Sequence, residues 1–194
     1  MKILIINGSP HAEGRTMTAL WAALAGCGLA PARPFCKGEL DAWGIEVCSP
    51  RGLSPCVDCG GCRSTGRCVI QDGFEELYRK VEESELVILA FPSYFDSFPA
   101  QLKAFIDRLQ SRFAVTFAVG RKPELLREGI AFMTAGTDGP QPVSDRTLSH
   151  IFAVLGARYL GTVYFGGTDQ KAPDPAEAAR RLQEIYGQRD KSEN

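Results

Sequence analysis

The feature that most constrains the fold lies at the start of the chain, where an apolar run, a loop and an amphipathic stretch follow one another. Residues 3–6 are all aliphatic, which favours a strand buried on both faces of a sheet. From Thr16 onward, apolar residues recur on one side of a predicted helix. The sequence therefore begins with a strand, a loop and a helix.

The loop between them, residues 7–16, has the features of an anion-binding cradle. Gly8 and Gly14 let the backbone turn tightly, while Ser9, Thr16 and main-chain N–H groups can face a ligand at the start of the helix. We expect a phosphate group there. The alternative is an ordinary turn in which the Ser9 side chain caps the helix.

The spacing of this loop argues against two common phosphate-binding motifs. A Walker loop needs four residues between its glycines and a following lysine, whereas five residues separate Gly8 from Gly14 and Arg15 takes the place of the lysine. The glycine triplet of a dinucleotide fingerprint is also missing. A nucleoside triphosphatase and a Rossmann dehydrogenase are therefore disfavoured.

Length and charge limit the remaining classes of protein. The chain has 194 residues, 44% of them hydrophobic, so we expect one domain over residues 1–187 with a frayed tail at 188–194. Lysine and arginine (22) nearly balance aspartate and glutamate (23), which favours neither nucleic acid nor a membrane as a partner. No apolar run could cross a membrane and no signal-peptide pattern opens the chain, so a cytoplasmic location is expected.

The periodicity predicts strands alternating with helices. Strands are expected at 3–6, 45–48, 86–91, 129–134 and 158–165, and helices from 16, over 73–83 behind Asp72 as N-cap, from 99, over 144–155 and from 174, with one further turn at 38–43. In the helix from 99, apolar side chains face inward, and Lys103, Asp107 and Arg108 are expected to face solvent. This alternation predicts a doubly wound α/β fold: a five-stranded parallel sheet, order 2-1-3-4-5, with helices on both faces. Ligands then bind beyond the carboxyl ends of strands one and three.

Three aromatic residues stand close together in the loop after the third strand. Tyr94, Phe95 and Phe98 lie between Pro92 and Pro99, where the helix pattern does not require them. A flat apolar ligand such as an isoalloxazine ring would explain them. The alternative is that they fasten the next helix to the core, which is favoured for Phe98.

Four of the seven cysteines form a compact motif in the loop at 51–72. Cys56, Cys59, Cys62 and Cys68 are spaced C-x2-C-x2-C-x5-C, and the first three match the start of a ferredoxin cluster motif. Structural zinc sites more often hold two separated C-x2-C knuckles. An iron-sulfur cluster is therefore favoured, with free thiols and zinc as alternatives. The other cysteines, Cys27, Cys36 and Cys48, are expected to be buried or incidental.

The sequence resembles the NADPH-dependent FMN reductase and iron-sulfur flavoprotein families, which have a flavodoxin-like fold. Three motifs in order carry the resemblance: Gly8-Ser9-Pro10 with Thr16, the cysteines from Cys56 to Cys68, and the segment from Pro92 to Arg108. It implies FMN with its phosphate on the first loop, and a [4Fe-4S] cluster on the four cysteines. The FMN-binding residues that it implies are Ser9, His11, Arg15, Thr16, Pro92, Ser93, Tyr94, Phe95, Asp96, Thr134, Ala135 and Gly136.

The resemblance also implies the chemistry. Electrons would pass from NAD(P)H or a reduced donor through FMN to a flavin, a quinone or another small acceptor. The flavin carries out the reaction, so no catalytic side chain is predicted. The alternative is an electron carrier in which FMN and a [4Fe-4S] cluster relay electrons between protein partners, and a metal-binding module without redox function ranks third. Relatives commonly form homodimers or homotetramers, so an oligomer is expected.

Overall fold

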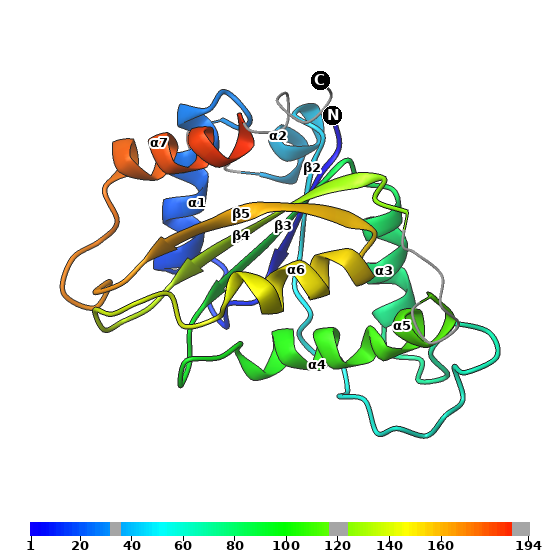
Figure 1. The fold of residues 1–194 in the computed structure, drawn as a ribbon. Coiled ribbons are helices and arrows are strands. Elements are labelled where there is room, and N and C mark those ends of the chain that lie inside the picture. The colour runs from blue at the N-terminus through cyan, green and yellow to red at the C-terminus, as the bar shows by residue number, and fades with distance from the viewer. Residues whose placement is uncertain (32–35, 117–123, 188–194) are drawn as a thin grey trace.

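A parallel five-stranded sheet forms the centre of the computed structural model, which describes residues 1–31, 36–116 and 124–187 (Figure 1). The strand order is β2-β1-β3-β4-β5, as predicted. The strands are β1 (Ile3–Asn7), β2 (Ile45–Cys48), β3 (Leu86–Pro92), β4 (Arg127–Thr134) and β5 (Ala157–Phe165). Their bounds differ from the predicted ones by no more than two residues at either end. The predicted tail at 188–194 lies outside the described residues.

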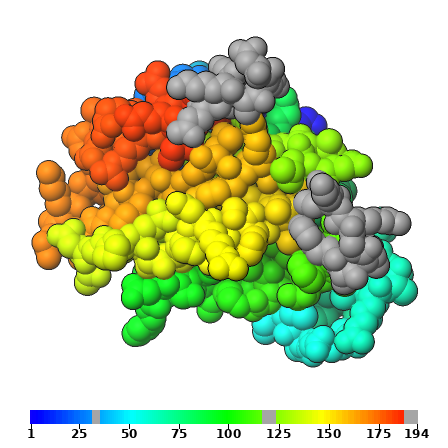
Figure 2. Space-filling view, in the orientation of Figure 1, coloured from blue at the N-terminus to red at the C-terminus, as the bar shows by residue number. Residues whose placement is uncertain are grey.

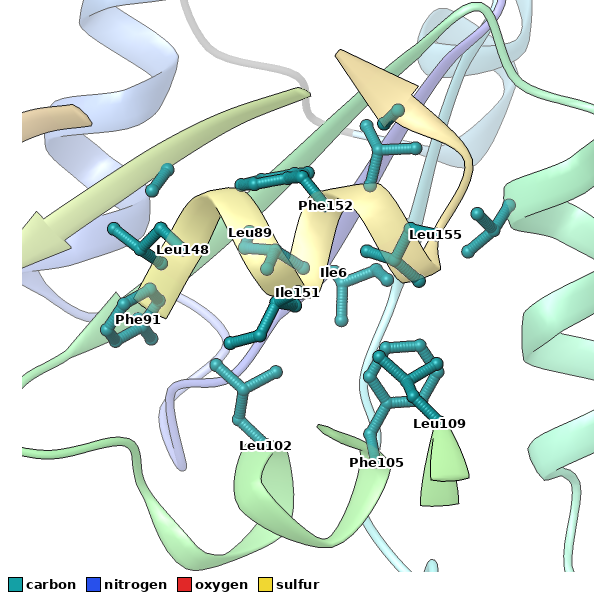
Figure 3. Packing of buried hydrophobic residues seen from close by; sticks show 14 of the residues in the cluster. Ile6, Leu89, Phe91, Leu102, Phe105, Leu109, Leu148, Ile151, Phe152 and Leu155 are labelled. Carbon is teal, nitrogen blue, oxygen red and sulfur yellow. The ribbon is translucent and has the colours of Figure 1, made fainter. Parts of the chain in front are cut away.

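Helices cover both faces of the sheet. They are α1 (Arg15–Gly26), α2 (Lys37–Ala42), α3 (Phe74–Glu82), α4 (Ala100–Arg108), α5 (Gln110–Thr116), α6 (Asp145–Val154) and α7 (Pro175–Tyr186). One buried cluster joins α1 and α7 to one face, through residues such as Ile5, Leu20 and Leu182. The other joins α3, α4 and α6 to the opposite face, where Leu102, Phe105 and Phe152 meet Ile6 and Leu89 (Figure 3).

This two-sided burial explains the continuous apolar runs in the sequence. Successive side chains of a strand point to opposite faces, so both must be apolar when helices cover both. Every residue of β1 is buried, and so is every residue of β3 except its last, Pro92. The carboxyl ends of these two central strands therefore meet at one rim of the sheet, where the chain reverses its direction of winding.

Two predictions about charged residues were wrong, and the same contact explains both. Asp72 is not the N-cap residue of α3: the N-cap is Gly73, at a φ of 92°, and Asp72 accepts a hydrogen bond from the Phe74 N–H at 3.4 Å from one position earlier. Arg108, expected to face solvent, is 1% exposed. The two side chains form an ion pair, with Arg108 Nη1 2.9 Å from Asp72 Oδ2. The pattern also missed α5, and among the described residues no helix is long and apolar enough to span a membrane.

Candidate functional site

A cleft of about 550 Å³ opens where the loops after four strands meet. Its lining comes from segments far apart in the sequence: Ser9, His11, Gly14, Arg15 and Thr16 after β1, Pro92, Ser93, Tyr94 and Phe95 at the end of β3, Thr134, Gly136 and Thr137 at the end of β4, and Thr168 and Asp169 after β5. The cleft thus lies at the rim where a doubly wound sheet binds its ligands.

A larger hollow, of about 700 Å³, runs along the edge strand β2. Among the described residues, its lining includes none from the loops after β1, β3, β4 or β5. Two of its charged side chains already pair with each other, Lys80 Nζ and Glu46 Oε1, which are 2.9 Å apart. The smaller cleft is therefore the candidate site.

The first loop of the cleft is shaped by close contact with α4. A Cβ atom at Gly8 would lie 2.7 Å from a methyl carbon of Leu102, so no other residue fits without a shift. The Gly8 carbonyl accepts a hydrogen bond from Gln101 Nε2 at 2.9 Å, and its N–H donates to the carbonyl of Ala90 at 2.8 Å. Glycine is therefore needed here for close packing.

The start of α1 offers donors to the cleft. No side chain caps the helix at Gly14, so first-turn N–H groups are available to an anion, which the helix dipole also favours. Ser9 does not cap it either, because Ser9 Oγ accepts from the His11 N–H at 3.1 Å. The hydroxyl of buried Thr16 lies 2.7 Å from that of Thr134, beside the helix start. This end of the cleft fits a phosphate.

An ion pair stands at the mouth of the cleft. Arg15 Nη1 lies 2.7 Å from Asp169 Oδ1, and both side chains are more than half exposed. Asp169 leans over the loop after β4, where a Cβ atom at position 136 would come within 2.4 Å of Asp169 Oδ2. Gly136 thus makes room for the carboxylate that holds Arg15.

The aromatic loop turns sharply and presents one ring entirely to solvent. Tyr94 and Ser97 exchange backbone hydrogen bonds of 3.0 and 3.1 Å, closing a turn in which Phe95 and Asp96 take φ values of 51° and 55°. Non-glycine residues rarely adopt this conformation. Phe95 is fully exposed, whereas Phe98 packs on Phe91 with ring centroids 5.0 Å apart. Phe98 is therefore a core contact, as favoured from the sequence, and Phe95 is not.

The four cysteines of the motif line a second cavity, of about 260 Å³. They lie in the cysteine-rich loop (residues 51–72), which forms one corner of the molecule, cyan in Figure 2. Asp58, Gly60 and Gly66 have φ values between 48° and 73° and turn the loop back on itself. Among the residues that the structure describes, no three His, Cys, Asp or Glu side chains are arranged to hold a metal ion. The cavity collects the four sulfur-bearing side chains without bringing them to ligand distance.

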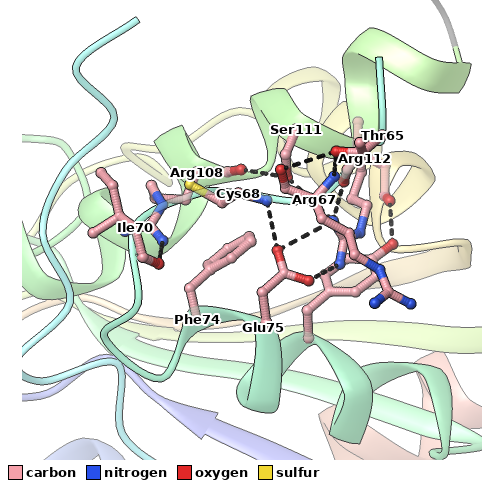
Figure 4. A network of polar contacts seen from close by, with 12 residues as sticks. Thr65, Arg67, Cys68, Ile70, Phe74, Glu75, Arg108, Ser111 and Arg112 are labelled. Carbon is pink, nitrogen blue, oxygen red and sulfur yellow. Dashed lines mark hydrogen bonds and ion pairs between the residues drawn. The ribbon is translucent and has the colours of Figure 1, made fainter. Parts of the chain in front are cut away.

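Two arginines, from α4 and the start of α5, hydrogen-bond to the cysteine-rich loop (Figure 4). Arg108 donates to the carbonyls of Ser54 and Ile70, both at 3.0 Å, near the two ends of the loop. Arg112 donates to the Gly66 carbonyl and pairs with Glu75, Nη2 to Oε2 at 2.8 Å. The loop is therefore held at several points by side chains of α4 and α5.

The carboxylates of this network are held ionised. Burial alone would raise the pKa of Asp72, but hydrogen bonds from Arg108 and from the Ser54 N–H bring it below its usual range. In the same way, Arg112 and the Cys68 N–H outweigh the burial of Glu75 and lower its pKa. Both carboxylates are therefore charged at neutral pH, and each is matched by an arginine.

The family model described as NADPH-dependent FMN reductase matches residues 1–171. The chain belongs to this family. The iron-sulfur flavoprotein of Methanocaldococcus jannaschii is 29% identical over 181 residues, covering 89% of this chain and 85% of the relative. That of Methanosarcina thermophila is 32% identical over 169 residues, covering 86% and 81%.

The fold is shared with solved structures. An FMN-dependent NADH-azoreductase from Bacillus anthracis, solved in complex with FMN, matches at a TM-score of 0.60 with 16% identity, covering 100% of both chains. The flavodoxin-like fold predicted from the sequence is thus confirmed. As a member of the NADPH-dependent FMN reductase family, the protein is an FMN-dependent oxidoreductase that uses NAD(P)H.

The cleft gathers most of the FMN-binding residues predicted from the sequence. Two of them, Asp96 and Ala135, are not among its lining residues. Asp96 lies exposed in the turn, and Ala135 is buried, its N–H bonded to the Phe165 carbonyl at 2.8 Å. Gly14, Thr137, Thr168 and Asp169 also line it and were not predicted. The last two follow β5, whose carboxyl end reaches the same rim, and this topological signal could have found them.

Proposed function

We propose that FMN binds in the 550 Å³ cleft and passes electrons from NAD(P)H to a small acceptor such as a quinone or another flavin. One observation carries the placement: the uncapped start of α1 and the exposed aromatic side chains of residues 94–95 open into the same cleft. A phosphate monoester and a flat ring need such a pair of environments.

The residues after β1 hold the phosphate end in this proposal. First-turn N–H groups of α1 and the hydroxyls of Ser9 and Thr16 donate to its oxygens, and Arg15 adds charge at the mouth. The glycine triplet of a dinucleotide fingerprint is missing from this loop, which supports FMN over FAD. His11, in the same lining, is a further candidate donor.

The loops after β3 and β4 border the ring. Tyr94 and Phe95 supply aromatic surface, while Thr134 and Gly136 leave room on the side of β4. The bound flavin supplies hydride and electron transfer, and the side chains bind, orient and shield it. No acid or base side chain is assigned a catalytic role.

The cysteine-rich loop is proposed to hold a [4Fe-4S] cluster. Four thiols around one cavity match the donor set of such clusters, and Arg108, whose buried Nε–H has no partner, lines the same cavity. The relatives named iron-sulfur flavoprotein support the assignment. When bound, the cluster would supply one-electron transfer.

That cavity favours a second candidate function, a carrier that relays electrons between proteins through FMN and the cluster. Anaerobic mixing with NADPH or NADH distinguishes the two. An oxidoreductase bleaches its flavin within the time of turnover and reduces an added quinone. A carrier bleaches slowly with either nucleotide but quickly with a reduced ferredoxin, and this result would overturn the first proposal.

Assembly into a homodimer or homotetramer is part of the proposal. The fully exposed Phe95 ring beside the cleft supports it, since a second subunit would cover apolar surface that one chain leaves open. Analytical ultracentrifugation of wild type and Phe95→Ser tests it. A monomeric wild type would contradict the assembly without affecting the FMN assignment.

A further inference from the structure

Arg108 has one N–H group more than its contacts use. A guanidinium carries five N–H donors. Nη1 donates to the Ser54 carbonyl and Asp72 Oδ2, and Nη2 donates to the Ile70 carbonyl and Asp72 Oδ1, which accounts for four of them. The fifth, on Nε, is buried and has no partner. Because an unsatisfied buried donor is costly, this N–H group calls for an acceptor close to it.

The surroundings of Arg108 indicate where that acceptor belongs. Arg108 lines the cavity that the four cysteines share. In Figure 4 the Cys68 sulfur lies next to the Arg108 guanidinium, whose other face rests on the Phe74 ring, 4.7 Å from its centroid. The Phe74 ring covers one face of the guanidinium, so the acceptor belongs on the side of the cavity, where the Cys68 sulfur lies.

Arg112 provides a natural comparison. It also lies under the cysteine-rich loop, but its donors reach Glu75, the Gly66 carbonyl and Ser111 Oγ. It does not line the cavity, and none of its nitrogens is buried without a partner. The two arginines thus share the structural task of holding the loop, and Arg108 alone has a spare donor at the cavity.

We propose that Arg108 donates its Nε–H to the sulfur that Cys68 brings to the bound cluster, and thereby raises the reduction potential of that cluster. The inference rests on the proposed [4Fe-4S] site. Reduction adds negative charge to the cluster and its sulfurs, so a buried cation and a hydrogen bond to sulfur stabilise the reduced form more than the oxidised form. Arg108 would then favour electron flow into the cluster.

The test compares Arg108→Gln with Arg112→Gln, since each removes one positive charge from beneath the same loop. Clusters are reconstituted anaerobically, iron and sulfide are counted, and the potential is measured by a redox titration followed by electron paramagnetic resonance. For Arg108→Gln we expect the ratio of reduced to oxidised cluster at a fixed potential to fall about tenfold, a shift of ~59 mV for one electron. Arg112→Gln should shift it clearly less, and only Arg108→Gln should change the Fe–S stretches in resonance Raman spectra.

Asp72→Asn serves as the second variant, because Arg108→Gln leaves the partly buried Asp72 carboxylate without its cation and can fail to fold. The asparagine removes the countercharge while Arg108 stays, so the potential should move the opposite way, toward easier reduction. Equal potentials in wild type, Arg108→Gln and Asp72→Asn would overturn the role of Arg108 alone. A wild-type protein that takes up no iron anaerobically would overturn the cluster and this inference together.

Discussion

The hydroxyl oxygens of Thr16 and Thr134 lie 2.7 Å apart, although 118 residues separate them in the sequence. Thr16 belongs to the first turn of α1 and Thr134 ends β4. Their contact joins the proposed phosphate end of the cleft to the proposed ring end. It also leaves each hydroxyl with capacity for a further partner, since a hydroxyl can donate one hydrogen bond and accept two.

Thr16→Ala should weaken FMN binding by about 1–3 kcal/mol, the cost of losing a hydrogen bond to a charged group. Thr18→Ala is the matched control, because Thr18 is exposed on the same helix and does not line the cleft. Dissociation constants from flavin fluorescence quenching provide the measurement. If both variants bind FMN as tightly as the wild type, the phosphate lies elsewhere.

In the ion pair at the mouth of the cleft, the Asp169 carboxylate should weaken FMN binding, because it repels the phosphate and holds Arg15. Asp169→Asn removes a negative charge near the proposed phosphate and frees Arg15, so we expect FMN to bind tighter by about 0.5–1 kcal/mol, the scale of exposed ion pairs. Arg15→Gln should weaken binding by a similar amount. A double-mutant cycle measures the coupling energy between Arg15 and Asp169 in FMN binding. Additive effects of the two substitutions on FMN affinity would show that the ion pair does not affect binding.

Phe95→Gly should separate binding from stability. Phe95 is fully exposed at a φ of 51°, so glycine relieves backbone strain. We therefore expect the free energy of unfolding of the apoprotein to rise by about 0.5–1 kcal/mol. The same change removes aromatic surface from the proposed ring site and should lower FMN affinity. Urea denaturation without FMN and flavin titration measure the two effects. Phe98→Ala, by contrast, should lose stability because its ring packs on Phe91.

Asp72 should make stability depend on pH in the acid range. Its pKa is lowered in the folded chain, so its contribution to stability is fully present above the ordinary aspartate pKa of ~4. That contribution is lost as the pH falls from there through the lower, folded value. Urea unfolding of wild type and Asp72→Asn between pH 3 and 6 measures it: the variant should lack this part of the pH dependence. If the free energies of unfolding of wild type and Asp72→Asn change in parallel down to pH 3, Asp72 does not contribute to the pH dependence of stability.

The sequence predicted the fold well because buried parallel strands carry a strong local signal. The runs at 3–6 and 86–91 are apolar without interruption, which indicates strands buried on both faces. The five-strand order was then predicted from the alternation of strands with helices. The loops at the carboxyl ends of parallel strands lie at the same edge of the sheet, so residues 9–16 and 92–95 could be predicted to lie close together.

Arg108 and Asp72 could not be placed in this way. Helical periodicity assigns a charged residue to the solvent face, and it carries no information about a loop that folds over that face. The partner of Arg108 lies 36 residues earlier in the sequence. The Arg15–Asp169 pair joins residues 154 positions apart and was missed for the same reason.

The hydrogen bonds from Arg108 and Arg112 to the cysteine-rich loop have a consequence for how the proposed cluster would be inserted. In a zinc finger the metal and the fold form together, and the chain without metal is unfolded. Here the loop is fastened at Ser54, Gly66 and Ile70 by side chains that belong to the core layers. These contacts need no metal, so the proposed cluster, if lost to oxygen, would be rebuilt in a loop that has kept its shape.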